Sequence, residues 1–124
     1  MPFRLHVVVF GALGVAFGLA ELVAPIALMR LYGLELDAGG AAVVRLAAAL
    51  NLGFGLTAIF ARRVSDAAGQ RAVLLGGLSY AVVALAVTAH ATLSGAVGPM
   101  MWSNLLICVP LGLNAGRLLL AARG

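Results

Sequence analysis

The chain has 124 residues, of which 64% are hydrophobic and only 10% are charged. Soluble domains average about 25% charged residues, so this composition excludes an ordinary soluble domain and indicates a membrane protein. The formal net charge is +4 and all eight basic residues are arginines. They stand mostly at the ends of apolar runs, which excludes the basic face of a nucleic-acid-binding protein. The length favours a single membrane domain over residues 1–124.

Four apolar runs are long enough to be transmembrane helices, since crossing a bilayer takes about 20 residues. We place these spans at residues 5–29, 41–61, 72–92 and 99–121. The first run resembles a secretory signal at its start, but it continues to Met29 and is too long for a signal core. Short connections favour antiparallel neighbours. The expected fold is therefore an all-α, integral membrane, antiparallel four-transmembrane-helix bundle.

The arginines predict the orientation of this bundle, because positive charge accumulates on the cytoplasmic side. Arg30 falls on one side of the membrane, together with Glu35 and Asp37. Six arginines fall on the other side if both termini share it, so we expect both termini in the cytoplasm: Arg4, Arg62, Arg63, Arg71, Arg117 and Arg123. Lysine is absent whereas alanine and glycine abound, which suggests a GC-rich bacterial genome and hence the bacterial cytoplasmic (inner) membrane.

The first span contains a carboxylate and a proline in the stretch "GLAELVAPIALMRLYG". Pro25 has no N–H, so it should kink the helix and free the carbonyl of Glu21, four residues earlier. Arg45 lies at a similar depth in the second span and carries enough N–H donors for both acceptors. We therefore predict an ion pair between Glu21 and Arg45 in the outer half of the bundle.

Small residues predict where the helices touch. Two G-x-x-x-G pairs let helix backbones approach closely, and we expect them to pack within the bundle rather than form a dimer seam. The face that carries the first pair also carries Glu21 and Pro25, so it should look into the bundle. The two pairs are Gly14 with Gly18 and Gly112 with Gly116.

Each remaining span has one polar or small face, and the simplest bundle turns all of these faces inward. The third span contributes Ser79, Tyr80 and His90, the second contributes Arg45 and Asn51, and the fourth contributes Ser103 and Asn114. We expect a cavity lined by Glu21, Arg45, Tyr80 and His90, with Ser103 as a further hydrogen-bonding group. Asn51, Ser79 and Asn114 are expected to be structural, since such groups hydrogen-bond across membrane helices.

No catalytic set or metal cluster emerges from these residues. The single cysteine, Cys108, excludes a cysteine cage, and His6 and His90 lie at opposite membrane faces, so no metal site is expected. The leading hypothesis is a non-enzymatic membrane module, either an accessory or scaffold subunit or a binder of a lipid- or quinone-like molecule. The alternative is a small dimeric proton-coupled transporter. An enzyme using Glu21 and His90 as acid and base is the third hypothesis.

Three segments resemble the DoxX-like superfamily of small four-helix bacterial membrane proteins: "PIALMRLYGLELD", "VVRLAAALNLGFGLTAIFARR" and "MMWSNLL". The shared features are a first helix followed by a "YG" loop, an arginine at the start of a glycine-rich second helix, and a tryptophan at the start of the last helix. Arg45 best matches a motif position of that family. Because some members accompany membrane oxidoreductases, including quinone-linked ones, the resemblance implies quinone as a candidate cofactor and a larger membrane complex as the partner. A homodimer is expected if the protein is a transporter, because four spans are few for that function.

Overall fold

A computed structural model describes residues 1–121, and within them it contains helices and turns but no strand. Four helices, with the 3₁₀ turns that adjoin two of them, are long and apolar enough to cross a membrane. This finding supports an all-α, multi-pass membrane protein. Arg123, which entered the orientation argument, lies outside the described residues. The long helices are α1 (Phe3–Val23), α3 (Ala38–Phe60), α4 (Ala67–Leu93) and α5 (Trp102–Ala121), and the short elements are α2 (Pro25–Leu31), η1 (Ala61–Arg63) and η2 (Pro99–Met101).

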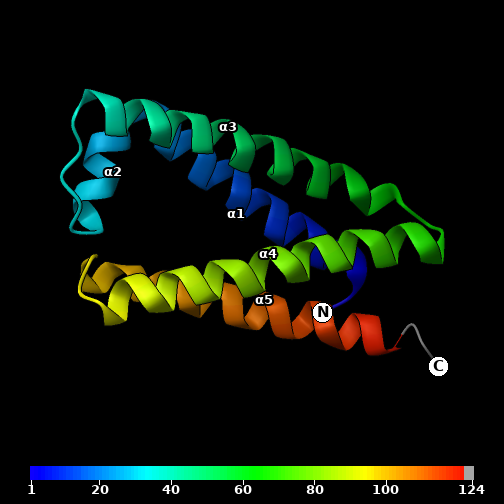
Figure 1. Ribbon diagram of the computed structural model, residues 1–124. Coiled ribbons are helices and arrows are strands. Elements are labelled where there is room, and N and C mark those ends of the chain that lie inside the picture. The colour runs from blue at the N-terminus through cyan, green and yellow to red at the C-terminus, as the bar shows by residue number, and fades with distance from the viewer. Residues whose placement is uncertain (122–124) are drawn as a thin grey trace.

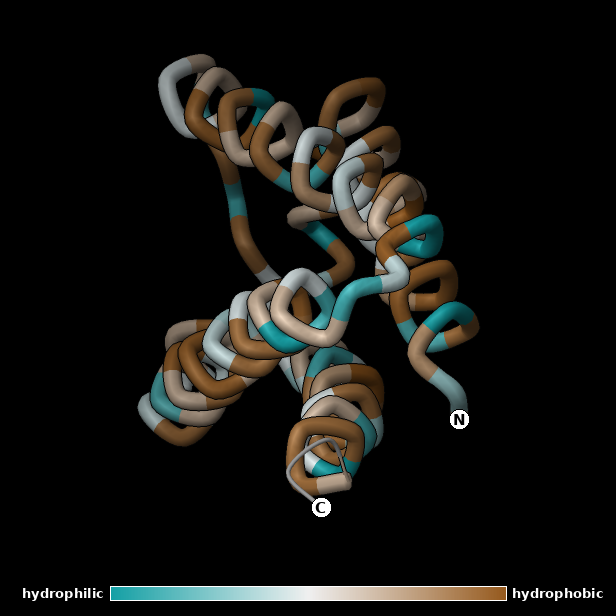
Figure 2. Tube along the Cα trace, turned by 90° about the vertical axis from the view of Figure 1, so that its right-hand side faces the viewer, coloured by the Kyte–Doolittle hydropathy of each residue, from teal (hydrophilic) through white to brown (hydrophobic). Residues whose placement is uncertain are grey.

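The long helices form two pairs. Helix α1 packs along α3 and helix α4 packs along α5, whereas α3 and α4 diverge from each other after the turn that connects them (Figure 1). Hydrophobic positions surround all four long helices instead of forming one stripe on each (Figure 2). Large apolar side chains stay exposed on the outer surface, Leu50 at 71% and Val83 at 62%, which suits a surface that faces lipid.

Proline divides the first predicted span into two helices. Residues 5–29 were expected to form one kinked helix, but α1 ends at Val23 and α2 begins at Pro25. Between them Ala24 has φ −135° and ψ 56°, outside the helical region. Proline is well suited to the first position of a helix, where its missing N–H has no intrahelical acceptor. Pro25 therefore starts a new, short helix instead of bending the old one.

Two aspartates set where the second and third long helices begin. The carboxylate of Asp37 accepts a hydrogen bond from Gly40 N at 2.7 Å, and that of Asp66 accepts one from Gly69 N at 2.6 Å. Such caps satisfy N–H groups that have no partner inside the helix. Helices α3 and α4 therefore begin at Ala38 and Ala67, earlier than the predicted spans, which began at residues 41 and 72. The reason is that the caps, and not hydropathy, determine where the first turns form.

Glycines bring the backbones of α1 and α3 into direct contact. A β-carbon built on Gly11 would lie 2.5 Å from the carbonyl oxygen of Gly55, and one on Gly14 would lie 3.2 Å from the α-carbon of Gly55. On Gly18 it would lie 2.8 Å from the side chain of Leu52. The predicted close packing of the Gly14–Gly18 face is therefore confirmed, and Glu21 and Pro25 on the same face are both buried.

The two pairs are joined at both ends of the molecule. At the end near the N-terminus, Phe3 and Val7 of α1 pack with three side chains of the second pair, Leu74, Ala115 and Leu119. At the opposite end, Gly98 N donates a 2.6 Å hydrogen bond to the carbonyl oxygen of Tyr32. Because these joins lie at the ends, the middle of the molecule can stay open.

Tyr32 anchors the second of these joins. Its side chain is only 5% exposed and its ring lies 6.2 Å from that of Phe17. Burial is the main cause that raises the pKa of the Tyr32 phenol. The phenol therefore stays neutral at physiological pH and serves as a packed aromatic group at this end of the bundle.

The expected inward orientation of the third span holds only at Tyr80, which is 45% exposed but whose ring contacts Phe10 of α1 and Phe54 of α3. Ser79, Val83, Val87 and His90, which were expected on the same inward face, all lie on exposed surface of α4. The reason is that α4 packs against α5 along a different face, which carries the buried Leu74, Ala81 and Thr88 at seven-residue spacing. Residues seven apart return to nearly the same side of a helix, so this narrow buried seam determines the orientation of α4.

Candidate functional site

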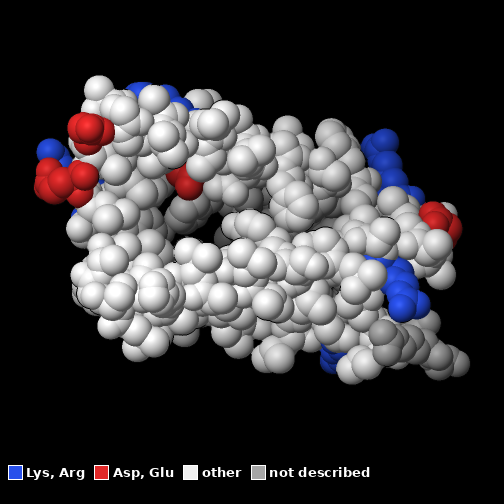
Figure 3. All heavy atoms as spheres, in the orientation of Figure 1, with Lys and Arg blue, Asp and Glu red and all other residues white. Residues whose placement is uncertain are grey.

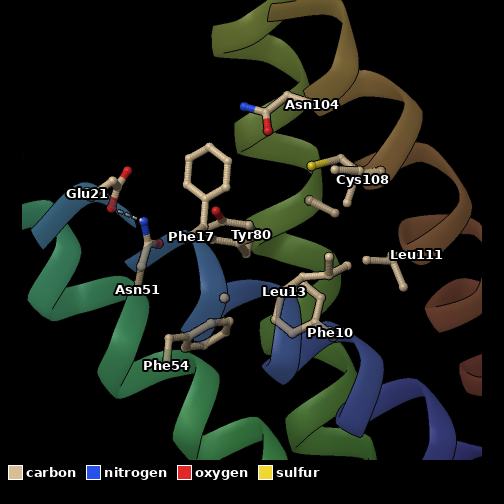
Figure 4. Close-up of a pocket in the computed structure, with 13 residues that line it drawn as sticks. Phe10, Leu13, Phe17, Glu21, Asn51, Phe54, Tyr80, Asn104, Cys108 and Leu111 are labelled. Carbon is tan, nitrogen blue, oxygen red and sulfur yellow. Dashed lines mark hydrogen bonds between the residues drawn. The ribbon is translucent and has the colours of Figure 1, made fainter. Parts of the chain in front are cut away.

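A cavity of about 200 Å³ lies between the two helix pairs. Figure 3 shows that the surface is hollowed here, between the α1–α3 pair and the α4–α5 pair. In the close-up, Glu21 and Asn51 lie on one side and Asn104 and Cys108 on the other, with Phe17 between them (Figure 4). The lining combines these polar groups with aromatic rings and aliphatic side chains: Phe10, Leu13, Gly14, Phe17, Phe54, Tyr80, Ala81, Ile107 and Leu111.

Glu21 is the acidic residue of this cavity, and it is 7% exposed. Asn51 Nδ2 donates a hydrogen bond of 2.8 Å to its Oε2 atom (Figure 4). This bond joins α1 to α3 and fixes the carboxylate at the edge of the glycine seam. Asn51 thus hydrogen-bonds between helices as predicted, and in doing so it orients the ionisable group of the site.

The predicted ion pair between Glu21 and Arg45 is wrong: within residues 1–121 no salt bridge joins them, and Arg45 is exposed. Both Arg45 and Asn51 lie on α3, but six residues of helix separate them by about 120° around the axis and about 9 Å along it. They therefore flank opposite edges of the surface that faces α1. Glu21 lies at the edge that carries Asn51.

Three aromatic rings form a cluster across the cavity wall. Phe54 and Tyr80 stack with ring centroids 5.7 Å apart and an interplanar angle of 28°. The ring of Phe10 meets both nearly edge-on, at 5.6 Å from Phe54 and 5.8 Å from Tyr80. These distances are typical of favourable aromatic pairs. The cluster therefore contacts both helix pairs, with Phe10 and Phe54 on α1 and α3 and Tyr80 on α4.

The structure brings together only part of the predicted site. Glu21 and Tyr80 line the cavity, as expected, whereas Arg45, His90 and Ser103 do not. His90 is exposed on α4. The hydroxyl of Ser103 donates a local hydrogen bond to the carbonyl oxygen of Met100 at 2.7 Å.

Sequence reasoning missed two of the five polar residues in the lining. Asn104 was not considered, and Cys108 was considered for no function other than metal binding, yet both line the cavity. Their spacing offered a signal, because residues four apart share a helix face. The same spacing relates Phe17 to Glu21 on α1, so following aromatic residues along the face of the carboxylate would have located this wall.

A second polar network lies at the other end of α1. The N-terminal amine of Met1 donates to Asn114 Oδ1 at 3.2 Å, and Asn114 Nδ2 lies 3.1 Å from Nδ1 of the buried His6. Asn114 therefore joins helices, as predicted. His6 also lines a separate, mainly apolar cavity of about 240 Å³, which borders the other side of Phe10 and Phe54. Phe10 and Phe54 of the aromatic cluster thus lie between the Glu21 cavity and the cavity that His6 lines.

Comparison of the chain with protein-family models, with curated proteins and with solved structures finds no match. Within residues 1–121, no group of three or more histidine, cysteine, aspartate or glutamate side chains is placed to hold a metal ion. The chemistry of the site therefore has to be inferred from its lining. A buried carboxylate, two amides, a thiol and four aromatic rings are suited to binding and orienting an apolar molecule that carries a polar group.

Proposed function

We propose that the protein is a non-enzymatic membrane module that binds a lipophilic small molecule in the cavity between its two helix pairs. One observation carries this proposal: the largely apolar cavity is partly lined by a buried carboxylate that another side chain holds in place. Ionisable residues within transmembrane segments are costly and usually mark functional sites. Binding a molecule there accounts for both the carboxylate and the space beside it.

We further propose that the helices run antiparallel through a bacterial cytoplasmic membrane with both termini in the cytoplasm. The support is the arginine distribution, with five of the six predicted cytoplasmic arginines in the described part of the chain. This orientation places Glu21 and its cavity in the outer half of the membrane. The "YG" loop, Arg45 and the tryptophan that begins α5 also support kinship with the DoxX-like superfamily, and through it a quinone-like ligand and a role as accessory subunit.

The topology is tested by cysteine labelling in intact cells. Glu35 and Ser65 are exposed and, unlike Asp37 and Asp66, cap no helix, so Glu35→Cys and Ser65→Cys preserve the fold. In a Cys108→Ala background, a membrane-impermeant maleimide should label position 35 and not position 65. Preferential labelling at position 65 would reverse the proposed orientation.

Ligand binding is tested by native mass spectrometry from a mild detergent. Leu13 lines the cavity, while Leu22 is similarly exposed on the same helix outside it, at 42% against 40%. Leu13→Trp should displace a molecule that co-purifies with the protein, or an added short-chain quinone, whereas Leu22→Trp should not. Equal retention by both variants would place the binding site elsewhere, and the absence of any bound molecule would contradict the proposal.

A small proton-coupled transporter is the second candidate, because the buried acid borders a cavity that opens between the helix pairs. Four spans are few for a transporter, so this reading requires a dimer. It predicts that the mass spectrum shows a dimer, and that a pH gradient across reconstituted vesicles drives uptake of the bound molecule. Glu21→Gln should abolish that uptake. A monomer that binds without transport supports the first proposal.

A further inference from the structure

The charge of the Glu21 cavity is one-sided. Glu21 is ionisable and acidic, whereas none of the seven arginines within residues 1–121 lines the cavity. The other titratable groups in the lining, Tyr80 and Cys108, are ordinarily neutral at pH 7. The carboxylate therefore receives a hydrogen bond from Asn51 but faces no opposite charge from another side chain of the lining. A bound cation would supply that charge.

The aromatic lining favours the same class of ligand. Four rings border the cavity, from Phe10, Phe17, Phe54 and Tyr80. The face of an aromatic ring carries partial negative charge and attracts cations, and the attraction is stronger where water is excluded. An anion would be repelled by both the carboxylate and the ring faces. A neutral quinone would gain hydrogen bonds from the two amides but nothing from the negative charge.

The size of the cavity fits a small organic cation. A cavity of about 150 Å³ lined by apolar side chains accommodates benzene, and this one is about 200 Å³ and partly open. A benzene ring extended by one quaternary ammonium group is therefore of suitable size. Its ring would lie against the aliphatic side chains of the lining, with the ammonium group toward Glu21 and the aromatic rings.

We infer that the cavity between the helix pairs binds a lipophilic monocation of the aromatic or alkyl ammonium class, with Glu21 as its counter-ion and the aromatic cluster as its second contact. This inference rests on the proposed binding of a lipophilic molecule in the same cavity, and it names an organic cation in place of a quinone-like ligand. Protonation of Glu21 would remove the counter-ion, so binding of the cation and of a proton at this carboxylate should exclude each other.

The experiment compares benzyltrimethylammonium with neopentylbenzene, its uncharged carbon isostere, on the full chain in a non-ionic detergent. Calorimetry follows the cation, and the shift in thermal unfolding temperature follows both compounds. Glu21→Gln should weaken binding of the cation by about tenfold or more and leave the effect of the isostere unchanged. Glu35→Gln, which neutralises an exposed glutamate outside the cavity, should change neither. Lowering the pH until carboxylates protonate should weaken cation binding to the unaltered protein only.

A second variant keeps the inference testable if Glu21→Gln fails to fold. Phe54→Leu retains the carboxylate but removes one ring of the aromatic cluster, so it should weaken binding of the cation more than binding of the isostere. Equal binding of the two compounds to the unaltered protein, or undiminished cation binding by folded Glu21→Gln, would overturn the inference. If the isostere or a quinone binds but the cation does not, the inference fails and the proposed function stands. If no lipophilic compound binds, both fail.

Discussion

The two helix pairs are built in different ways. In the α1–α3 pair, glycines on both helices bring the backbones together, and a β-carbon added to Gly55 would lie 2.8 Å from the carbonyl oxygen of Gly11. In the α4–α5 pair, a β-carbon added to Gly112 would meet Ala81 at the ordinary distance of 3.4 Å, and one added to Gly116 would meet nothing within 4 Å. The first pair is locked by its backbone, whereas side chains separate the helices of the second.

This difference divides the candidate site into a fixed and an adaptable wall. The fixed wall carries Glu21 and Asn51, whose hydrogen bond crosses the tight seam. The adaptable wall carries Tyr80, Asn104 and Cys108 on the looser pair. A binding site benefits from rigid placement of its charged group, because ordering that group on binding costs free energy. The looser pair can then adjust to the shape of the bound molecule.

The largest effect is expected from breaking the tight seam. Gly55→Ala places a methyl group against backbone atoms of α1, which cannot rotate away, so the helices must separate. Overpacking of this kind typically costs 1–3 kcal/mol, and here we expect a loss of about 3 kcal/mol in the free energy of unfolding, measured by circular dichroism in a denaturing detergent titration. Gly53→Ala is the matched control, because a β-carbon there meets nothing within 4 Å. It should be neutral or stabilise by up to about 1 kcal/mol. Equal losses in the two variants would refute the rigid seam.

The next effect concerns the two asparagines, one in each wall. Asn51→Leu keeps the side-chain size but removes the hydrogen bond to Glu21, leaving a buried carboxylate without that donor. Such a loss costs about 1–3 kcal/mol. Asn104 makes only a weak contact of 3.7 Å with the sulfur of Met101, so Asn104→Leu should change stability by about 0.5 kcal/mol or less. Thermal unfolding of both variants measures the difference, and a larger loss for Asn104→Leu would contradict the assignment of the fixed wall.

A smaller effect is expected where the two pairs meet in the loops. Gly33 and Gly95 both have positive φ, 77° and 72°, so alanine at either position is strained by about 1–2 kcal/mol. A β-carbon on Gly33 would in addition lie 2.9 Å from Gly98 N, while one on Gly95 meets nothing within 4 Å. Gly33→Ala should therefore lower the unfolding temperature more than Gly95→Ala. Similar shifts would mean that the Tyr32–Gly98 hydrogen bond contributes little to holding the pairs together.

The contrast between the walls also explains what the sequence could and could not predict. Length and apolar runs located four spans, and the spacing of Gly14, Gly18, Glu21 and Pro25 identified the buried face of α1. These signals are local and strong. The predicted partner of Glu21 was Arg45, chosen for its charge, but the observed partner is Asn51 on the same helix. The two side chains differ by about 120° around α3, and this difference, which charge pairing ignores, determines which of them reaches Glu21.

The orientation of α4 was harder for a different reason. Lipid is as apolar as a protein interior, so no hydrophobic stripe distinguishes the packed face of a membrane helix from its lipid face. The stripe of Ser79, Tyr80 and His90 was polar enough to suggest an inward face, but the packing seam is made by Leu74, Ala81 and Thr88. The cavity wall on α5 was missed because Asn104 and Cys108 gain meaning only once α4 and α5 are placed against the first pair.

The smallest effect tests the loose seam itself. Gly112→Ala adds a methyl group at ordinary contact distance from Ala81, and Gly116→Ala adds one in open space. Both substitutions replace glycine by a better helix former, which stabilises an exposed helix interior by up to about 1 kcal/mol. We therefore expect both variants to unfold at or slightly above the temperature of the unaltered protein, in contrast to Gly55→Ala.

The decisive comparison is between Gly112→Ala and Gly55→Ala, since each adds the same methyl group to one of the two helix pairs. If Gly112→Ala destabilises as strongly as Gly55→Ala, the α4–α5 pair is as tightly locked as the α1–α3 pair, and the distinction between a fixed and an adaptable wall fails. If Gly112→Ala instead preserves stability but alters the size of the molecules that the cavity accepts, the adaptable wall is assigned to α4 and α5.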